Sequence, residues 1–238
     1  MANEQSTLQA AQYAILRIVA AHSSEVYLVG GTALAMHLHH RESEDLDFFS
    51  VTHARRMHQA IVRHIRTTTG YTYNLVEERK QTKSFMPYAR HEFIINRTLR
   101  LKIDFVKDPD PLLDARLPSG LASMDDIYYR KILATAGRPK GISVIGTPTF
   151  SGRHMAKDVF DLWYLSEHYA PLSEWFPRHC DRAAYERLNR WLRSLSRPRM
   201  TSELLDNVKA TVRVDTKRIW QHLDRHILDI LNRTYTQP

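Results

Sequence analysis

Two aspartates separated by one residue, Asp45 and Asp47, are the strongest candidates for chemistry in this sequence. If the segment around them is extended, the side-chain period of two places both carboxylates on one face. Two carboxylates that close repel each other unless a cation neutralises them, and a divalent metal is the usual choice. The pair therefore predicts a metal site, with Mg²⁺ or Mn²⁺ as the expected ion.

A third carboxylate, Asp104, lies in the run TLRLKIDFV, where apolar and charged residues alternate. The alternation predicts a strand with Asp104 on its polar face. A strand-borne acidic pair with a third acid from another strand is typical of two-metal nucleotidyl transfer, in which two Mg²⁺ ions clamp the attacking and leaving oxygens. Asp45 and Asp47 are expected to bind both metals, and Asp104 to bind one and help deprotonate the attacking hydroxyl. The alternative is three ordinary, solvated aspartates at strand ends.

A glycine pair, Gly30 and Gly31, precedes the acids. Glycines let a backbone pass close to a phosphate, and a helix after them directs free N–H groups at an anion. Thr32 is expected to cap that helix. Together with the acids, this turn predicts a metal-dependent site for a nucleoside triphosphate.

A second group of charged residues lies later in the chain. We expect Arg153, Lys157 and Asp161, spaced four apart, to share one face of a helix. Lys131, on an earlier helix, could neutralise triphosphate charge, and Asp158 could orient it or the base. The alternative is a ladder of surface salt bridges.

The hydrophobic pattern predicts a mixed-sheet α/β (α+β) unit followed by helices. The expected domains are residues 1–110, a catalytic α/β domain, and residues 111–238, a helical domain that completes the cleft and binds the acceptor. Residues 107–120 contain several breakers and are expected to be a linker. The helices are expected at residues 5–22, 33–40, 52–69, 123–136, 153–167, 181–195, 202–212 and 215–232, and the strands at 26–29, 45–49, 71–79, 90–97 and 98–106.

The composition favours a soluble protein with a polyanionic partner. The 238 residues carry a net charge of +8 and an estimated pI of 9.6, which favours nucleic acid over a membrane. There is no apolar run of about 18 residues and the N-terminus lacks the regions of a signal peptide. The single cysteine, Cys180, fits a reducing cytoplasm.

The run GGTALAMHLHHRESEDLDFF resembles the signature of the AbiEii/AbiGii-type nucleotidyltransferase toxins, in the polymerase-β-like superfamily. The similarity continues to about residue 165 and includes Lys131 and the segment RHMAKDVFDLWYL. The spacing between Lys131 and Arg153 is longer than expected for the family, and the insert at 137–152 is interpreted as a substrate loop or a partner-specific excursion. The residues that carry the signature are Gly30, Gly31, Thr32, Ala33, Leu34, His40, Arg41, Ser43, Asp45, Asp47, Phe48 and Phe49.

The resemblance implies a toxin of a type IV toxin–antitoxin or phage-defence pair, with a winged-helix antitoxin as partner. It implies transfer of a nucleoside monophosphate from an NTP to RNA, with tRNA 3′ ends as the expected acceptor. The residues expected to be catalytic are Asp45, Asp47, Asp104, Lys131 and Asp158. The residues expected to bind the nucleotide are Gly30, Gly31, Thr32, Arg41, Ser43, Lys131, Arg153 and Lys157.

Three rival functions remain open at this point. One is nucleotidyl transfer to a protein or small molecule, and another is phosphoryl transfer with the same metals. The third is a non-catalytic module that binds nucleic acid or protein, which the intact set of three costly carboxylates argues against.

Other residues suggest further sites. The histidines His37, His39 and His40 are expected to be packed or solvated rather than zinc ligands. Lys80, Lys83 and Arg90 are expected near the acidic face, as contacts to triphosphate or RNA. An arginine-rich stretch with interleaved aromatic residues, 175–199, suggests either an RNA grip with base stacking or one amphipathic helix with a buried apolar face.

Overall fold

The computed structural model describes residues 2–52, 55–80, 82, 86–137, 139–142, 148–150 and 152–235. The chain forms two compact units. The first comprises Met1–His37 and Ser43–Ile127, and the second comprises Leu38–Glu42 and Tyr128–Pro238.

A five-stranded mixed sheet with the order β1-β2-β5-β4-β3 forms the centre of the first unit. The central pair, β2 and β5, is parallel, and the other neighbouring strands are antiparallel. The sheet confirms the expected α/β class and the alternating strand that carries Asp104. The elements of this unit are α1 (Ala2–His22), β1 (Tyr27–Val29), α2 (Gly30–Leu38), β2 (Leu46–Ser50), α3 (Arg55–Thr69), β3 (Thr72–Arg79), β4 (Tyr88–Ile94) and β5 (Arg100–Lys107), followed by the start of α4 (Met124–Ala136).

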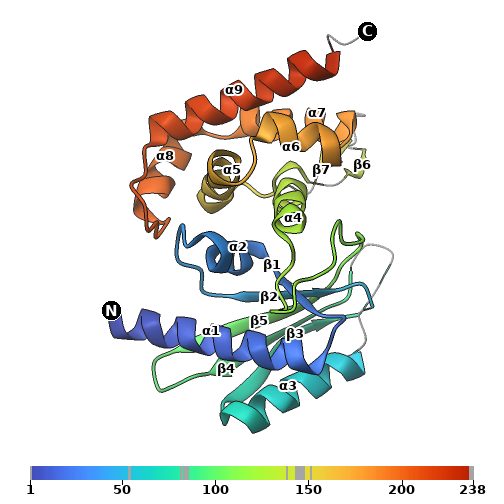
Figure 1. Cartoon of the computed structure of the whole chain (residues 1–238), viewed down its shortest axis with the longest axis vertical. Coiled ribbons are helices and arrows are strands. Elements are labelled where there is room, and N and C mark those ends of the chain that lie inside the picture. The colour runs from blue at the N-terminus through green and yellow to red at the C-terminus, as the bar shows by residue number, and fades with distance from the viewer. Residues whose placement is uncertain are drawn as a thin grey trace. The chain divides into compact units, whose positions relative to one another are not determined.

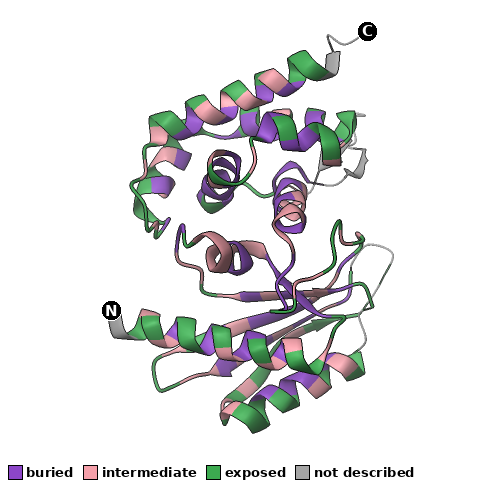
Figure 2. Cartoon of the chain, in the orientation of Figure 1, coloured by how far each residue is buried: buried purple, intermediate pink, exposed green. Residues whose placement is uncertain are grey.

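The sheet has one apolar face and one polar face, as expected from the period of two along each strand. Phe48, Phe93 and Phe105 are buried on the apolar face. Helices α1 and α3 lie side by side along this face (Figure 1), and His58 of α3 stacks on Phe105 with ring centroids 4.9 Å apart. The buried residues alternate with more exposed ones along β2 and β4 (Figure 2). The polar residues that could do chemistry therefore point away from α3.

The segment after β5 belongs to the first unit, which differs from the expected boundary after residue 110. The backbone N–H of Leu28 donates to the carbonyl of Gly120, and the N–H of Ala122 donates to the carbonyl of Leu28. The Tyr27 hydroxyl donates to Asp108 at 2.7 Å. These bonds hold residues 108–122 against β1, so the break in compactness falls inside α4 instead.

The second unit is helical. Its core includes Tyr128 and Trp175, whose rings stack 4.4 Å apart, and the buried residues of α5 such as Phe160 (Figure 2). Residues 40–42 pair with 209–211 through backbone hydrogen bonds, which places them in this unit. Its elements are the rest of α4, a hairpin of β6 (Pro139–Ile142) and β7 (Pro148–Phe150), α5 (Ala156–His168), α6 (Leu172–His179), α7 (Arg182–Ser194), α8 (Arg197–Asp206) and α9 (Thr216–Tyr235).

Several expected boundaries were wrong. Helix α2 begins at Gly30, so Thr32 lies inside it rather than capping it. Arg153 precedes α5 and shares no helix face with Lys157 and Asp161. Helix α8 ends at Asp206, whereas a helix was expected over 202–212, and α6 was not expected at all. No helix in the described part of the chain combines the length and apolar character needed to cross a membrane.

Candidate active site

Gly30 brings the backbone directly against Asp47. The φ angle of Gly30 is +78°, in the left-handed region that favours glycine. A Cβ at this position would stand 2.5 Å from Oδ2 of Asp47. Any side chain at position 30 would therefore displace the carboxylate, which explains physically why a glycine precedes the acidic pair.

The turn between α2 and β2 is held by the Thr32 side chain. Its hydroxyl lies 2.8 Å from the Ser43 hydroxyl and also donates to the Asp45 carbonyl. Gln12 of α1 donates to the Ser43 carbonyl at 2.9 Å. Thr32, expected to bind the nucleotide, thus positions the Ser43–Asp45 segment through its side chain, and Ser43 lies beside it.

Five charged residues share the polar face of the sheet, and together they are called the acidic face: Asp45, Asp47, Arg90, Lys102 and Asp104. Asp47 and Asp104 are register partners on the parallel strands β2 and β5, so their side chains point to the same side. Arg90 is the register partner of Asp104 on β4. The strand register thus brings the three expected acids to adjacent strands.

Cations already neutralise two of these acids. Nε and Nη2 of Arg90 donate to the two oxygens of Asp104 at 2.9 and 2.8 Å. Nζ of Lys102 lies 2.6 Å from Oδ2 of Asp45. The hydrogen bond to Asp104 raises the pKa of Arg90, so its guanidinium stays charged. Asp104 is only 6% exposed. Although it lies on the polar face of the sheet, its carboxylate is therefore buried and ion-paired rather than open to solvent.

The donor set fits a hard divalent cation, because Mg²⁺ prefers carboxylate oxygens. Within the described residues, however, no three His, Cys, Asp or Glu side chains lie close enough together to hold a metal ion. Arg90 and Lys102 hold the carboxylate oxygens of Asp104 and Asp45 that a metal would use. A metal at this face would have to compete with these two cations.

A second group of charged residues forms inside the second unit, here called the ion cluster: His40, Arg41, Lys131, Arg153, Asp158 and Asp161. Asp161 is fully buried at its centre. Arg41 donates from Nε and Nη2 to the two oxygens of Asp161 at 2.6 and 2.8 Å. His40 Nε2 lies 2.8 Å from Oδ1, and Lys131 Nζ contacts Oδ2. Because a carboxylate only accepts, His40 must be the donor through Nε2.

Asp158 is the second acid of the ion cluster and is also fully buried. Its Oδ1 lies 3.2 Å from Nζ of Lys131 and 3.2 Å from Nη2 of Arg153. Its Oδ2 is buried and has no hydrogen-bond partner in the part of the chain that the structure describes. Half of the Arg153 side chain is exposed, and Lys157 is exposed on α5. Asp158 therefore has one oxygen available for a further donor.

The electrostatics of the ion cluster keep it charged. Burial by itself raises the pKa of Asp161, but the charges of Lys131 and Arg41 outweigh burial and lower this pKa well below its ordinary value. For Arg41, burial lowers the pKa, but the attraction of Asp161 outweighs it and raises the pKa overall. Burial lowers the pKa of His40, so its imidazole is neutral at pH 7. The cluster holds four buried ionisable side chains beside the neutral histidine, with Arg153 at its edge: Arg41, Lys131, Asp158 and Asp161.

The other suggested sites are placed as follows. His37 Nε2 lies 3.2 Å from the Ala122 carbonyl, whereas His40 bonds Asp161, so these histidines have separate partners. Burial raises the pKa of Cys180 to about 12, which keeps its thiol protonated. Lys80 is exposed, and Lys83 lies outside the described residues.

Base stacking by the arginine-rich stretch was a wrong interpretation, because its aromatic side chains are not available. Trp175, Tyr185 and Trp191 are all buried. Trp191 donates to the Arg153 carbonyl at 2.7 Å, and Leu188 and Leu192 share its buried face. The stretch forms α6, α7 and the start of α8, and its alternative interpretation as an amphipathic element is confirmed for α7.

Four residues of these two groups were not among those expected to be catalytic or to bind the nucleotide, although Arg90 was expected near the acidic face: His40, Arg90, Lys102 and Asp161. Lys102 and Asp104 alternate on one strand, so their common face was visible in the sequence. The pairing of β4 with β5 in one register was not visible, and neither was the convergence of residues 40–41 with 161.

A family model described as nucleotidyl transferase AbiEii toxin, type IV TA system, matches residues 14–236. No curated protein matches the chain. Among solved structures, a proposed nucleotidyltransferase from H. pylori is 18% identical, with both chains covered fully and a TM-score of 0.63. JHP933 from Helicobacter pylori is 18% identical over 98% of this chain and 96% of that chain, with a TM-score of 0.58. MenT4, a nucleotidyltransferase toxin from Mycobacterium tuberculosis H37Rv, is 11% identical over 96% of this chain and 84% of that chain, with a TM-score of 0.54.

Proposed function

Because the chain belongs to the AbiEii nucleotidyl transferase toxin family of type IV toxin–antitoxin systems, we propose that it transfers a nucleoside monophosphate from an NTP to the 3′ end of an RNA, with tRNA as the acceptor. Membership of this family makes the chain a toxin nucleotidyltransferase, with an NTP as substrate and an antitoxin as partner. The metal requirement, the RNA acceptor, a winged-helix fold of the antitoxin, a role in phage defence and a cytoplasmic location are parts of the proposal.

The observation that carries the proposal is the common face of Asp45, Asp47 and Asp104. In-line transfer forms a bond from the acceptor hydroxyl oxygen to the α-phosphorus and breaks the bond to the bridging α–β oxygen, which releases pyrophosphate. Both oxygens carry developing charge that needs a cation. Asp45, Asp47 and Asp104 are the residues that would hold Mg²⁺, which when bound supplies that positive charge.

Asp104 is the proposed acceptor of the proton from the attacking hydroxyl. The two hydrogen bonds from Arg90 hold the Asp104 carboxylate in one orientation. Asp104 is register partner to Asp47, so the proton acceptor lies on the strand next to the acidic pair. Arg90 is therefore a positioning residue, which acts through Asp104.

The turn at Gly30 and Gly31 is the proposed contact to the triphosphate. Gly30 has no Cβ, so the Asp47 carboxylate lies directly against the backbone at the start of α2. The N–H groups at the start of α2 are oriented for an anion. Ser43, held beside Thr32, offers a hydroxyl to the same segment.

The ion cluster is proposed to neutralise triphosphate charge. Arg153 and Lys157 reach solvent and are the candidates for direct contact with phosphates. Lys131 lies buried between Asp158 and Asp161, which hold its ammonium in place. Arg41 donates to Asp161 and to the Glu42 carbonyl, so it supports the cluster in this state.

The acceptor class rests on charge and on the family. The net charge of +8 favours a polyanion, and the backbone of tRNA supplies one.

The direct experiment incubates the full-length protein with each α-³²P-labelled NTP, Mg²⁺ and a mixture of tRNA, cell protein and small metabolites. We expect label in the tRNA fraction and none with Asp47→Asn. Label only in protein or metabolites contradicts the RNA acceptor. Label in tRNA from a γ-³²P-labelled NTP, but from none of the α-³²P-labelled NTPs, contradicts nucleotidyl transfer.

A further inference from the structure

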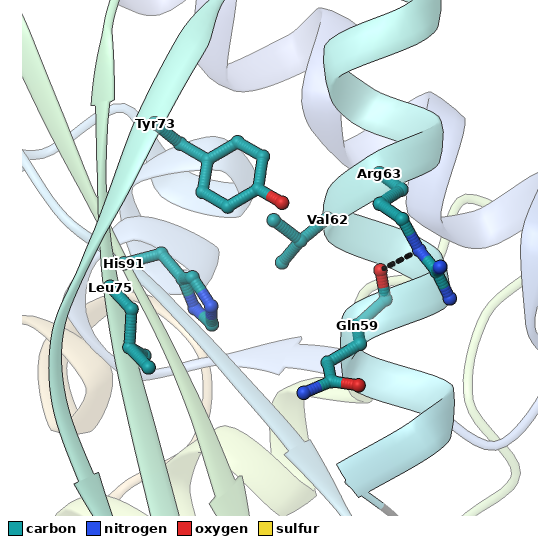
Figure 3. A pocket seen from close by; sticks show the side chains of 6 residues that line it. All are labelled: Gln59, Val62, Arg63, Tyr73, Leu75 and His91. Atoms are coloured by element: carbon teal, nitrogen blue, oxygen red, sulfur yellow. Dashed lines mark hydrogen bonds between the residues drawn. The ribbon is translucent and has the colours of Figure 1, made fainter.

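A cavity of about 310 Å³ lies in the first unit between α3 and the sheet edge formed by β3 and β4. Figure 3 shows its lining side chains, which come from both sides: Gln59, Val62, Arg63, Tyr73, Leu75 and His91. Successive residues of a strand point to opposite faces, so His91 lies on the face opposite Arg90 and the acidic face. Nothing in the proposed transfer uses this cavity.

The lining combines apolar walls with one unsatisfied polar atom. Val62, Leu75 and the Tyr73 ring form the walls, and the Tyr73 and His91 rings meet edge to face with centroids 5.8 Å apart. His91 is 5% exposed, and among the described residues its Nδ1 has no hydrogen-bond partner. A buried polar atom without a partner costs about 1–3 kcal/mol, so a ligand that bonds Nδ1 recovers free energy. Burial lowers the pKa of His91, which leaves the ring neutral and able to donate or accept.

The mouth of the cavity is basic. Helix α3 carries Arg55, Arg56, Arg63 and Arg66 and no acidic residue. Arg63 is exposed and its Nε donates to the Gln59 carbonyl, as the dashed line in Figure 3 shows. The acidic residues of β3 have their own cations, because Glu77 pairs with Arg79 and Glu78 pairs with Arg55. Arg63 therefore offers a positive charge at the mouth to the anionic group of a ligand.

The backbone beside the cavity is irregular. The register between β3 and β4 shifts between Leu75 and Glu77, which is a β-bulge. Bulges are frequent at sheet edges and beside binding sites, where they redirect side chains. Leu75 remains half exposed next to this bulge, although it is a large apolar residue.

We propose that this cavity binds a small molecule that joins one planar ring system to an anionic group, namely a free nucleoside 5′-monophosphate. Its ring lies against Tyr73 and Val62, with a ring nitrogen or amino group bonded to His91 Nδ1, and its phosphate pairs with Arg63. The volume is at the low end of ligand cavities, about 300–1,000 Å³, which suits one mononucleotide rather than a strand. The site is separate from the acidic face, and the inference does not rest on the proposed transfer activity.

The test is a titration of the full-length protein, with ¹⁵N-labelled histidine, by AMP, CMP, GMP and UMP in buffer that contains EDTA. Chelation removes divalent metals, so metal-dependent binding at the acidic face does not contribute. We expect at least one monophosphate to bind with a Kd below about 1 mM and to shift the His91 ring resonances. Arg63→Gln is expected to weaken binding at least about fivefold through loss of the charge pair. Arg66→Gln, which removes the same charge from the same helix outside the cavity, is expected to change the Kd less than about twofold.

The outcomes separate the proposal from its rivals. Failure of all four monophosphates to bind overturns it, and so does equal weakening by Arg63→Gln and Arg66→Gln, which indicates attraction to general positive charge. Tighter binding of the trinucleotide CCA than of any monophosphate replaces the free nucleotide with an RNA end. Leu75→Trp, at a half-exposed position, fills the mouth without disturbing the core and is expected to abolish binding. Label transfer to tRNA by Arg63→Gln is measured beside these titrations, because an equal loss of transfer contradicts a separate site.

Discussion

Arg41 and Asp161 form a buried, two-point ion pair across 120 residues of sequence, with donor–acceptor distances of 2.6 and 2.8 Å. Arg41 is part of the motif that includes Asp45 and Asp47, but it belongs to the second compact unit. The motif therefore supplies residues to both units, and Asp161 is the acid that holds its arginine.

Asp161→Asn should destabilise the protein strongly. The substitution leaves the charges of Arg41 and Lys131 buried without their carboxylate, and breaking a buried pair costs about 3–5 kcal/mol. The measurement is the urea midpoint followed by circular dichroism. Asp224→Asn is the matched control, because Asp224 pairs with Arg193 and Arg197 at the surface, where a pair contributes about 1 kcal/mol or less. Equal midpoints for the two variants contradict a central role for Asp161.

Gly30→Ala should reduce transfer at least about tenfold, while Gly70→Ala should leave it nearly unchanged. Both glycines have positive φ, so both substitutions strain the backbone by about 1–2 kcal/mol. At position 30 the new Cβ meets the Asp47 carboxylate, whereas at position 70 it meets no atom of the described residues within 4 Å beyond its chain neighbours. Initial rates of label transfer from NTP, with unfolding midpoints measured in parallel, separate the two effects. If both variants lose the same activity, strain alone is responsible.

Arg90→Gln should strengthen divalent metal binding at the acidic face about tenfold or more, because the guanidinium competes for both oxygens of Asp104. The affinity is measured by Mn²⁺ titration with electron paramagnetic resonance. Arg100→Gln removes an exposed charge from the same sheet and serves as control, since Arg100 donates to the Asn96 carbonyl instead. Unchanged Mn²⁺ affinity in Arg90→Gln contradicts the assignment of Asp104 as a ligand.

The features of the fold that could be predicted from the sequence are those that a local pattern of residues determines. Alternation identified the strand of Asp104. The helix expected over 123–136 matches α4, and Ser123 caps its first turn by accepting from the Asp126 N–H at 3.0 Å. Each of these features depends on neighbours within a few residues or on one strand's own period.

Contacts distant in sequence account for the features that were not predicted. Arg153 lies outside α5 because its N–H bonds the Ala134 carbonyl and its carbonyl accepts from Trp191, which hold it out of the helix. Helix α6 is eight residues long and contains Pro177, so its pattern argues against a helix, whereas burial of Trp175 stabilises it. The cations Arg90 and Lys102 became partners of the acids only through strand register.

Stability should fall as pH decreases from 6.5 toward 4, in part through His222. Burial lowers the pKa of His222 from 6.5 to about 4. Between these two pH values the unfolded chain takes up a proton on His222 that the folded chain does not, so acid favours unfolding. Above pH 6.5 the histidine is neutral in both states, and His222 causes no loss of stability there. Urea midpoints measured across this range should fall less steeply for His222→Gln than for the wild type. His64→Gln, at an exposed histidine of α3, is the control, and an unchanged slope in His222→Gln contradicts the assignment.

The most direct test of the central claim is sequencing of RNA 3′ ends from cells that express the protein or its Asp47→Asn variant. Asp47 lies beside Gly30 and in register with Asp104, so its loss should abolish transfer while the amide keeps nearly the same shape. We predict untemplated nucleotides on tRNA 3′ ends with the wild-type protein and none with the variant. Identical 3′ ends in the two samples contradict a nucleotidyl transfer that depends on the acidic face.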